Sequence, residues 1–146
     1  MPAARPTRCR GQTAVEAAVV LMTFVAVFLG IIDMGRIYMT WQKLQAGVRE
    51  ATRYGITGRA MKNKDREASI RSTLQSNSGL TIDPSNITIQ SRTTTTAGSV
   101  TGAGTPNDVL IVSASMPVRI FSPWLLPVLG KNFTVRARAA LRNENF

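Results

Sequence analysis

Histidine is absent from the sequence, and Cys9 is its only cysteine. Without histidine the chain cannot form a Cys/His nucleophile pair or a zinc site built on histidine. A single cysteine cannot form a disulfide within the chain. Other polar residues, such as Asp108, Ser113 and Ser115, show no spacing that a catalytic motif requires. We therefore predict that the protein is not an enzyme and that it holds no metal and no cofactor.

Acidic residues are scarce in this chain. Its 146 residues include 8 Asp and Glu against 18 Lys and Arg, which gives a net charge of +10. Such a chain is attracted to anionic surfaces, among them phospholipid headgroups, nucleic acid and acidic proteins. Charge alone does not choose among these partners.

Charge is missing altogether from residues 17–32, between Glu16 and Asp33. A membrane-spanning helix needs roughly 20 predominantly apolar residues, and neighbouring residues at both ends lengthen this stretch. The two acids then lie near the two interfaces, where a charge costs much less than at the centre of a bilayer. Because the stretch is apolar on every side of a helix, a buried helix of a small soluble domain explains it poorly. We predict a transmembrane helix segment over residues 12–36.

The regions on either side of this segment indicate its orientation. A short basic leader, residues 1–11, favours the cytoplasm and leaves the rest of the chain outside. A removable secretory signal needs small residues before its cut, and the bulky Phe28 lies two residues before Gly30. The segment is therefore expected to stay with the protein. Residues 37–146 are predicted to form an extracytoplasmic domain whose first part, residues 37–58, continues the helix.

Several motifs along about the first 58 residues of the chain carry a family resemblance. Gly11-Gln12-Thr13-Ala14-Val15-Glu16 resembles the site cut by prepilin peptidases. The others are Gly30-Ile31-Ile32-Asp33-Met34-Gly35-Arg36, Leu44-Gln45-Ala46, Val48-Arg49-Glu50-Ala51 and Arg53-Tyr54. Together they resemble the opening of TadE-like proteins, the minor pilins or pseudopilins of the Tad (tight adherence) pilus. Residues 135–142 also resemble the last strand of that family.

The resemblance implies a function, partners and a location. The chain would be a pilin-like structural and assembly subunit of a Tad-type (type IVc) pilus, acting in pilus biogenesis, adhesion or secretion. A prepilin peptidase would cut it between Gly11 and Gln12. Its other partners would be further pilin-like subunits, the pilus assembly platform and membrane lipid. It would cross a bacterial inner membrane once, with the N-terminus cytoplasmic and the domain periplasmic, extracellular or incorporated in the pilus.

Glu16 would become the fifth residue of the cut chain, and it has two interpretations. In the first, it pairs with the free amine of Gln12 on a neighbouring subunit and sets the axial register between subunits. Losing one partner of a well-buried pair costs roughly 3–5 kcal/mol. In the second, it only favours the positive N-terminal end of its own helix, which is worth roughly 0.3–1 kcal/mol.

Two further groups near the membrane also leave alternatives open. Asp33 and Arg36 are three residues apart and share one helical face. They form either an interfacial ion pair, worth at most about 1 kcal/mol, or a contact with a partner pilin. A proline-bounded apolar loop contains Trp124, Leu125 and Leu126. It either plugs the edge of the sheet or the lower end of the helix, or presents a patch to lipid or a partner.

Apolar residues beyond the membrane segment recur at three- and four-residue steps, which predicts one continuous helix from Gln12 to about Thr57. The residues of that inner face are Ile37, Trp41, Leu44, Val48, Ala51 and Gly55. Gly47, within the same helix, either permits close packing or is a tolerated weak position.

The remainder predicts a second helix, capped by Asp65 and running to about Ser76, and then strands. The strands are expected around Ile87 and Ile89, over residues 108–121 and over residues 133–141. Residues 93–107, rich in Thr, Gly and Ala, are predicted to form a flexible loop. The fold class is therefore α+β, with a long N-terminal helix, a short second helix and a small antiparallel sheet of three or four strands.

The last predicted strand carries Arg136, Arg138 and Arg142 opposite its apolar face. These arginines suggest an alternative function, a membrane-anchored extracytoplasmic protein that binds DNA or another polyanion. Phosphate contacts of this kind would give binding a steep salt dependence. Because no aromatic residues are interleaved on the strand, specific single-strand recognition is not expected.

Overall fold

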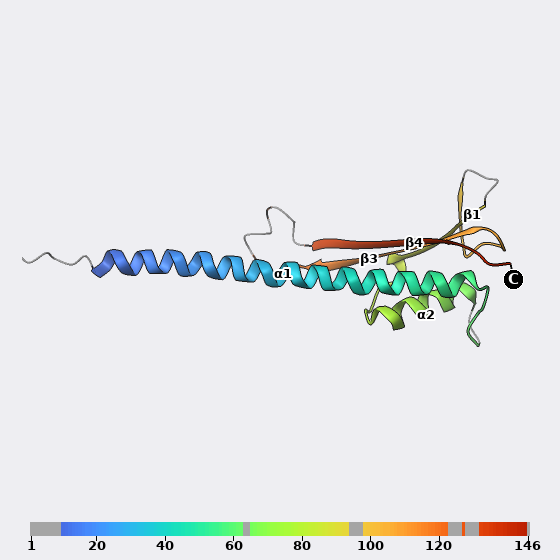
Figure 1. The fold of residues 1–146 in the computed structure, drawn as a ribbon, viewed down its shortest axis with the longest axis horizontal. Helices are drawn as coiled ribbons and strands as arrows, with labels where there is room; N and C mark the ends of the chain where they lie inside the picture. Colours follow the sequence, from blue (N-terminus) through green and yellow to red (C-terminus); the bar gives the residue numbers. More distant parts are fainter. Residues whose placement is uncertain (1–9, 63–64, 94–97, 123–126, 128–131, 146) are drawn as a thin grey trace, which may run out of the picture.

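The computed structural model describes residues 10–62, 65–93, 98–122, 127 and 132–145. A long helix and a shorter one lie along the same side of a four-stranded antiparallel sheet (Figure 1). The elements are α1 Arg10–Ile56, α2 Arg66–Ser78, the 3-10 helix η1 Pro84–Asn86, β1 Ile87–Arg92, β2 Ser99–Thr101, β3 Val109–Arg119 and β4 Asn132–Arg142. The predicted α+β class is confirmed.

Helix α1 is unbroken over 47 residues, a length of about 70 Å at roughly 1.5 Å per residue. Its C-terminal part lies along β3 and β4, whereas its N-terminal part projects beyond the other described helices and strands (Figure 1). Leu44, Val48 and Ala51 are fully buried on the inner face, as their spacing predicted. Trp41 was assigned to the same face, but it is 43% exposed. Its ring packs instead on Tyr38, with ring centroids 5.9 Å apart.

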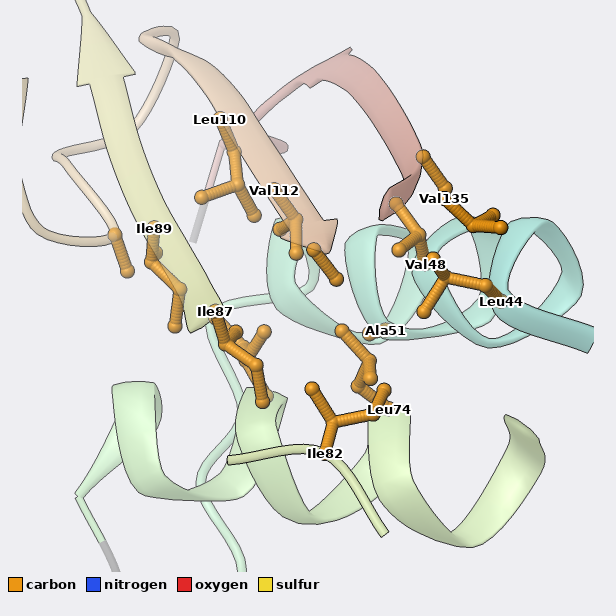
Figure 2. Packing of buried hydrophobic residues seen from close by; sticks show 14 of the residues in the cluster. Leu44, Val48, Ala51, Leu74, Ile82, Ile87, Ile89, Leu110, Val112 and Val135 are labelled. Atoms are coloured by element: carbon orange, nitrogen blue, oxygen red, sulfur yellow. The ribbon is translucent and has the colours of Figure 1, made fainter. Parts of the chain in front are cut away.

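The hydrophobic core lies between the sheet and the two helices (Figure 2). Helix α2 contributes Ile70 and Leu74, both fully buried. The sheet contributes alternate residues of its strands, as a strand with one covered face requires. Those buried in the core are Ile87, Ile89, Leu110, Val112, Ala114, Val118, Val135 and Ala137.

The sheet has the order β2-β1-β3-β4, with every pair antiparallel. Strand β3 pairs with β4 along its whole length, whereas β1 covers only the half of β3 from Val109 to Ala114. Strand β2 lies within the segment predicted to be a flexible loop, so that prediction is wrong at Ser99–Thr101. All three residues of β2 are exposed, and a strand of three residues is too short for an alternation of apolar and polar residues to identify it in the sequence.

Helix α2 begins after Asp65, which occupies the predicted cap position but makes no capping hydrogen bond with its side chain, and extends to Ser78, two residues beyond its expected end. Gly79 closes it with φ 60° and donates its N–H to the carbonyl of Gln75. This left-handed residue after the last turn is a common way to end a helix, and glycine adopts it without a steric cost.

A polar cluster at the end of the domain farthest from the projecting helix joins four segments. The Arg66 guanidinium donates to the Gly55 carbonyl at 2.7 Å and 3.1 Å, to the Gly104 carbonyl at 2.8 Å and to Asn143 Oδ1 at 3.0 Å. Burial lowers the pKa of Arg66 from its ordinary value. We call this cluster, Arg66 with Gly55, Gly104 and Asn143, the distal clasp. The Gly55 carbonyl lies in the last turn of α1 and also accepts the Gly58 N–H at 3.4 Å, so Arg66 adds hydrogen bonds to a carbonyl at a helix end.

Asp108 closes the turn that precedes β3. Its Oδ2 accepts the backbone N–H of Thr105 at 2.8 Å and the Thr105 hydroxyl at 2.7 Å. These two bonds hold the pKa of Asp108 below its usual range. The backbone carbonyl of Asp108 also accepts the N–H of Asn143 at 2.7 Å, so this turn is joined to the distal clasp.

Gly47 lies where α1 crosses α2. A Cβ at this position would lie 2.7 Å from the Cβ of Ser78 and 2.9 Å from the carbonyl oxygen of Leu74. Of the two interpretations of this glycine, close packing is therefore the one that the structure supports.

We expect Gly47→Ala to lower the thermal stability of the full chain in detergent. Overpacking costs about 1–3 kcal/mol, more than the gain of about 1 kcal/mol that alanine brings to a helix. Gly35→Ala is the matched control, because a Cβ there meets nothing within 4 Å. The control should hold or raise the unfolding temperature. Equal shifts for the two variants would contradict the close-packing interpretation.

Candidate assembly interface and membrane anchor

Residues 11–32 of α1, here called the bare segment, are almost entirely uncovered by the rest of the described chain. Their large apolar side chains are exposed, for example Val20 at 69%, Met22 at 75% and Phe24 at 66%. Only 6% of the most apolar stretch of α1 is buried within the described structure. By length and composition this helix can cross a membrane, and it is consistent with a single-pass anchor.

Three polar side chains of the bare segment, those of Gln12, Glu16 and Thr23, form hydrogen bonds within the helix itself. Thr23 donates its hydroxyl to the Val19 carbonyl at 2.9 Å. Gln12 Nε2 donates to Glu16 Oε1 at 3.1 Å. Glu16 is the only charged residue between Gly11 and Ile32, and it is exposed. The segment therefore presents one negative charge near the start of an otherwise apolar rod.

The predicted processing site lies in the first turn of α1. The helix begins at Arg10, so Gly11 and Gln12 are both helical, and both are exposed. No acidic residue lies in that first turn, which places Glu16 beyond the reach of the strongest helix-end field. In the uncut chain Glu16 therefore gains little from the N-terminus of its own helix.

Asp33 ends the bare segment and is only 3% exposed. Its Oδ2 accepts the backbone N–H of Ser122 at 2.7 Å and that of Phe121 at 3.1 Å, and its Oδ1 lies 3.3 Å from the Phe121 nitrogen. Hydrogen bonds from backbone N–H groups to a carboxylate are among the stronger ones in proteins. The carboxylate therefore fixes the end of β3 to the helix at the point where the helix leaves the domain.

Arg36 is the predicted ion-pair partner of Asp33. Its Nη1 lies 3.8 Å from Asp33 Oδ1, near the limit for an ion pair and too far for a hydrogen bond. The guanidinium carbon is 4.4 Å from the centroid of the Phe121 ring, a cation–π arrangement. The dominant partners of Asp33 are thus backbone N–H groups, and Arg36 is held mainly by an aromatic ring.

On the N-terminal side of the core residues, one face of α1 is less exposed than its other faces. Between residues 11 and 37, Gly30 and Asp33 are buried and Ala26 and Ile37 are half-buried, while every other residue is exposed. These four positions recur at three- and four-residue steps and so share one face. Other helices or lipid can reach the remaining faces of this part of α1.

The arginines of β4 lie on the outer face of the sheet, as their alternation predicted. Arg136 is paired with Ser115, and Arg138 with Ser113. Both arginines line a shallow groove of ≈ 470 Å³ together with Asn86, Thr88 and those two serines. Arg142 donates its Nε to the Asn107 carbonyl at 3.2 Å. The other predicted patch, Trp124, Leu125 and Leu126, lies outside the described residues.

Comparison with known families gives one result. Residues 11–53 match the family model of TadE-like proteins. The resemblance inferred from the sequence motifs is thereby confirmed over most of α1. The TadE-like match begins at Gly11 and includes Glu16, Asp33 and Arg36, and it indicates a pilin-like protein associated with the Tad pilus. Comparison with curated proteins and with solved structures gives no significant match.

Sequence reasoning missed the residues that receive the Asp33 carboxylate. Phe121 and Ser122 are separated from Asp33 by almost ninety positions, and they bind through their backbone N–H groups. A backbone donor leaves no trace in residue type, so no sequence signal could have identified it. The distal clasp was missed for a similar reason, because three of the Arg66 hydrogen bonds go to backbone carbonyls.

We expect Asp33→Ala to free the end of β3 from α1. Leaving buried N–H groups unpaired costs about 1–3 kcal/mol, so hydrogen exchange at the Phe121 and Ser122 amides should accelerate roughly 5- to 150-fold. Asp33→Asn keeps one acceptor oxygen and should give a smaller effect. Glu50→Ala, on the same helix within the domain, should leave both amides unchanged. Undiminished protection in Asp33→Ala would show that the carboxylate does not hold this segment.

Proposed function

We propose that this chain is a pilin-like structural and assembly subunit of a Tad-type pilus, cut between Gly11 and Gln12 by a prepilin peptidase. The subunit is anchored in a bacterial inner membrane by α1, with the basic leader in the cytoplasm and the α+β domain outside. It contributes to pilus biogenesis, and through the pilus to adhesion or secretion. Its partners are other pilin-like subunits and the assembly platform, and it performs no chemistry itself.

The observation that carries the proposal is the bare segment. A helix with this much exposed apolar surface needs lipid or other helices around it, because soluble monomers rarely expose such large apolar patches. Its single charge, Glu16, is exposed and placed near the proposed new N-terminus. The match to TadE-like proteins begins at Gly11, the residue before the proposed cut.

The cleavage site is compatible with access by a peptidase. Gly11 is exposed, and a Cβ added there meets nothing within 4 Å. The cut requires the first turn of α1 to open, and the ends of helices open at little cost in free energy. The new N-terminus then carries a charged amine that can approach Glu16 of a neighbouring subunit within a poorly hydrated bundle of helices.

The polyanion alternative has less support. The groove beside Arg136 and Arg138 contains hydroxyls suited to an anion, but the comparison with known families favours the pilus function. An assay of DNA binding across salt concentrations separates the two, because phosphate contacts give steep salt dependence.

The proposed cleavage between Gly11 and Gln12 predicts the mass of the mature protein. In cells with an active prepilin peptidase, mass spectrometry should find a chain that starts at Gln12. In cells lacking the peptidase the leader should remain, and Gly11→Leu should keep it in either background. This variant changes an exposed position with open space around it, so α1 should fold as before. An intact leader in the presence of the active peptidase would contradict the proposal.

Glu16 should matter for assembly far more than an ordinary surface acid. If it pairs with a neighbouring amine in a buried setting, Glu16→Gln removes a contribution of roughly 3–5 kcal/mol and should abolish subunit cross-linking and pilus production. Glu50→Gln makes the same change in charge on the same helix within the domain and serves as the control. If Glu16→Gln assembled as well as this control, the register role would be excluded.

A further inference from the structure

A cluster of cationic and aromatic side chains surrounds α1 directly above the bare segment. Arg36 lies over the ring of Phe121, with its guanidinium carbon 4.4 Å from the ring centroid. Phe121 is 68% exposed, and the Arg36 side chain is 45% exposed. Tyr38 and Trp41 form an aromatic pair on the adjoining turns of the helix. We call Arg36, Phe121, Tyr38 and Trp41 the collar.

The negative charge at this level is turned away from the surface. Asp33 is 3% exposed, and its oxygens are occupied by the N–H groups of Phe121 and Ser122. Arg36 remains partly exposed at the surface. A guanidinium stacked on an aromatic face keeps its in-plane N–H donors free to form a bidentate contact with a phosphate.

The collar lies at the height of a lipid headgroup. The bare segment is about 33 Å long at roughly 1.5 Å per residue, close to the hydrocarbon thickness of about 30 Å. Tyrosine and tryptophan are enriched at this interface in membrane proteins. Residues 33–43 and 119–122 carry three cations, Arg36, Lys43 and Arg119, against one carboxylate. The local charge is therefore positive and complementary to an anionic leaflet.

We propose that the collar binds the phosphate of an anionic phospholipid in the leaflet on the side of the domain, with Arg36 as the phosphate ligand. Phe121 holds the guanidinium in place, and Arg119 adds to the local positive potential. This inference rests on the proposed membrane anchoring of α1. It gives the subunit a preferred lipid in addition to a membrane-spanning helix.

The test uses the full chain in nanodiscs of phosphatidylcholine and phosphatidylglycerol in equal amounts, followed by native mass spectrometry of the lipids retained. The wild type should retain phosphatidylglycerol in preference to phosphatidylcholine. Arg36→Gln should reduce that preference about fivefold, the factor expected for losing one cation near an anionic leaflet. Phe121→Leu, which removes the ring and leaves every charge, should reduce it by less. Arg49→Gln, the same change in charge higher on α1, should retain the preference of the wild type.

Other results overturn the inference. Equal retention of the two lipids by the wild type would exclude an anionic lipid site, as would an unchanged preference in Arg36→Gln. If Arg36→Gln fails to fold in detergent, Phe121→Leu decides, and an unchanged preference there has the same meaning. Loss of subunit cross-linking in Arg36→Gln with the lipid preference intact would assign the collar to a protein partner. A wild type that fails to enter nanodiscs would refute the membrane anchor itself.

Discussion

One continuous helix has to satisfy two different surroundings, and this constraint shapes the rest of the molecule. Over its C-terminal part α1 supplies core residues such as Leu44 and Val48 to a small domain. Over its N-terminal part it meets no other described element along most of its surface. A helix is suited to both, because all its central backbone groups are paired within it and need neither water nor a neighbour. The change of surroundings therefore requires only a change in side chains along one rod.

The domain is fixed to this rod at two places on either side of the core. At the membrane-proximal end the Asp33 carboxylate holds the N–H groups of Phe121 and Ser122. At the distal end Arg66 binds the Gly55 carbonyl, and Glu144 donates its N–H to the Ile56 carbonyl at 2.9 Å. Hydrogen bonds have directional requirements that apolar contacts lack. The hydrogen bonds at these two places therefore fix the position of the sheet along α1, while the core supplies most of the free energy of folding.

The elements of this fold could be predicted from sequence where their signals are local. Apolar steps of three and four residues identified the long helix, and alternation identified the long strands. These local signals failed where the type of a residue gave no information about which residues surround it in the folded chain. Trp41 has the spacing of a core residue but packs on Tyr38 at the surface, and β2 consists of exposed residues. Gly47 left two interpretations open until the position of Ser78 was known.

The residues of the candidate site also divide into those with a local signal in the sequence and those without one. The roles of Gly11 and Glu16 stay predictions; their spacing carries the family resemblance, and the family match includes both residues. Asp33 and Arg36 were identified as a pair, which they are only weakly at 3.8 Å. Their main partners, Phe121 and Ser122, lie just after the end of β3, across a distance in sequence that local patterns do not span. The sequence thus indicates which residues carry charge near the membrane, and the fold determines whether each charge is exposed or enclosed.

The two acids at the ends of the bare segment have opposite surroundings, and this difference bears on assembly. Asp33 is enclosed by its own domain, so it is not available to a neighbouring subunit. Glu16 lies about 25 Å lower at roughly 1.5 Å per residue, where no described part of the domain covers the helix. Near Asp33 the less exposed face of α1 restricts the directions from which another helix can approach, whereas near Glu16 every direction is open. Close packing between subunits is therefore least hindered at the end of α1 that carries Glu16, the acid for which we propose a neighbouring amine as partner.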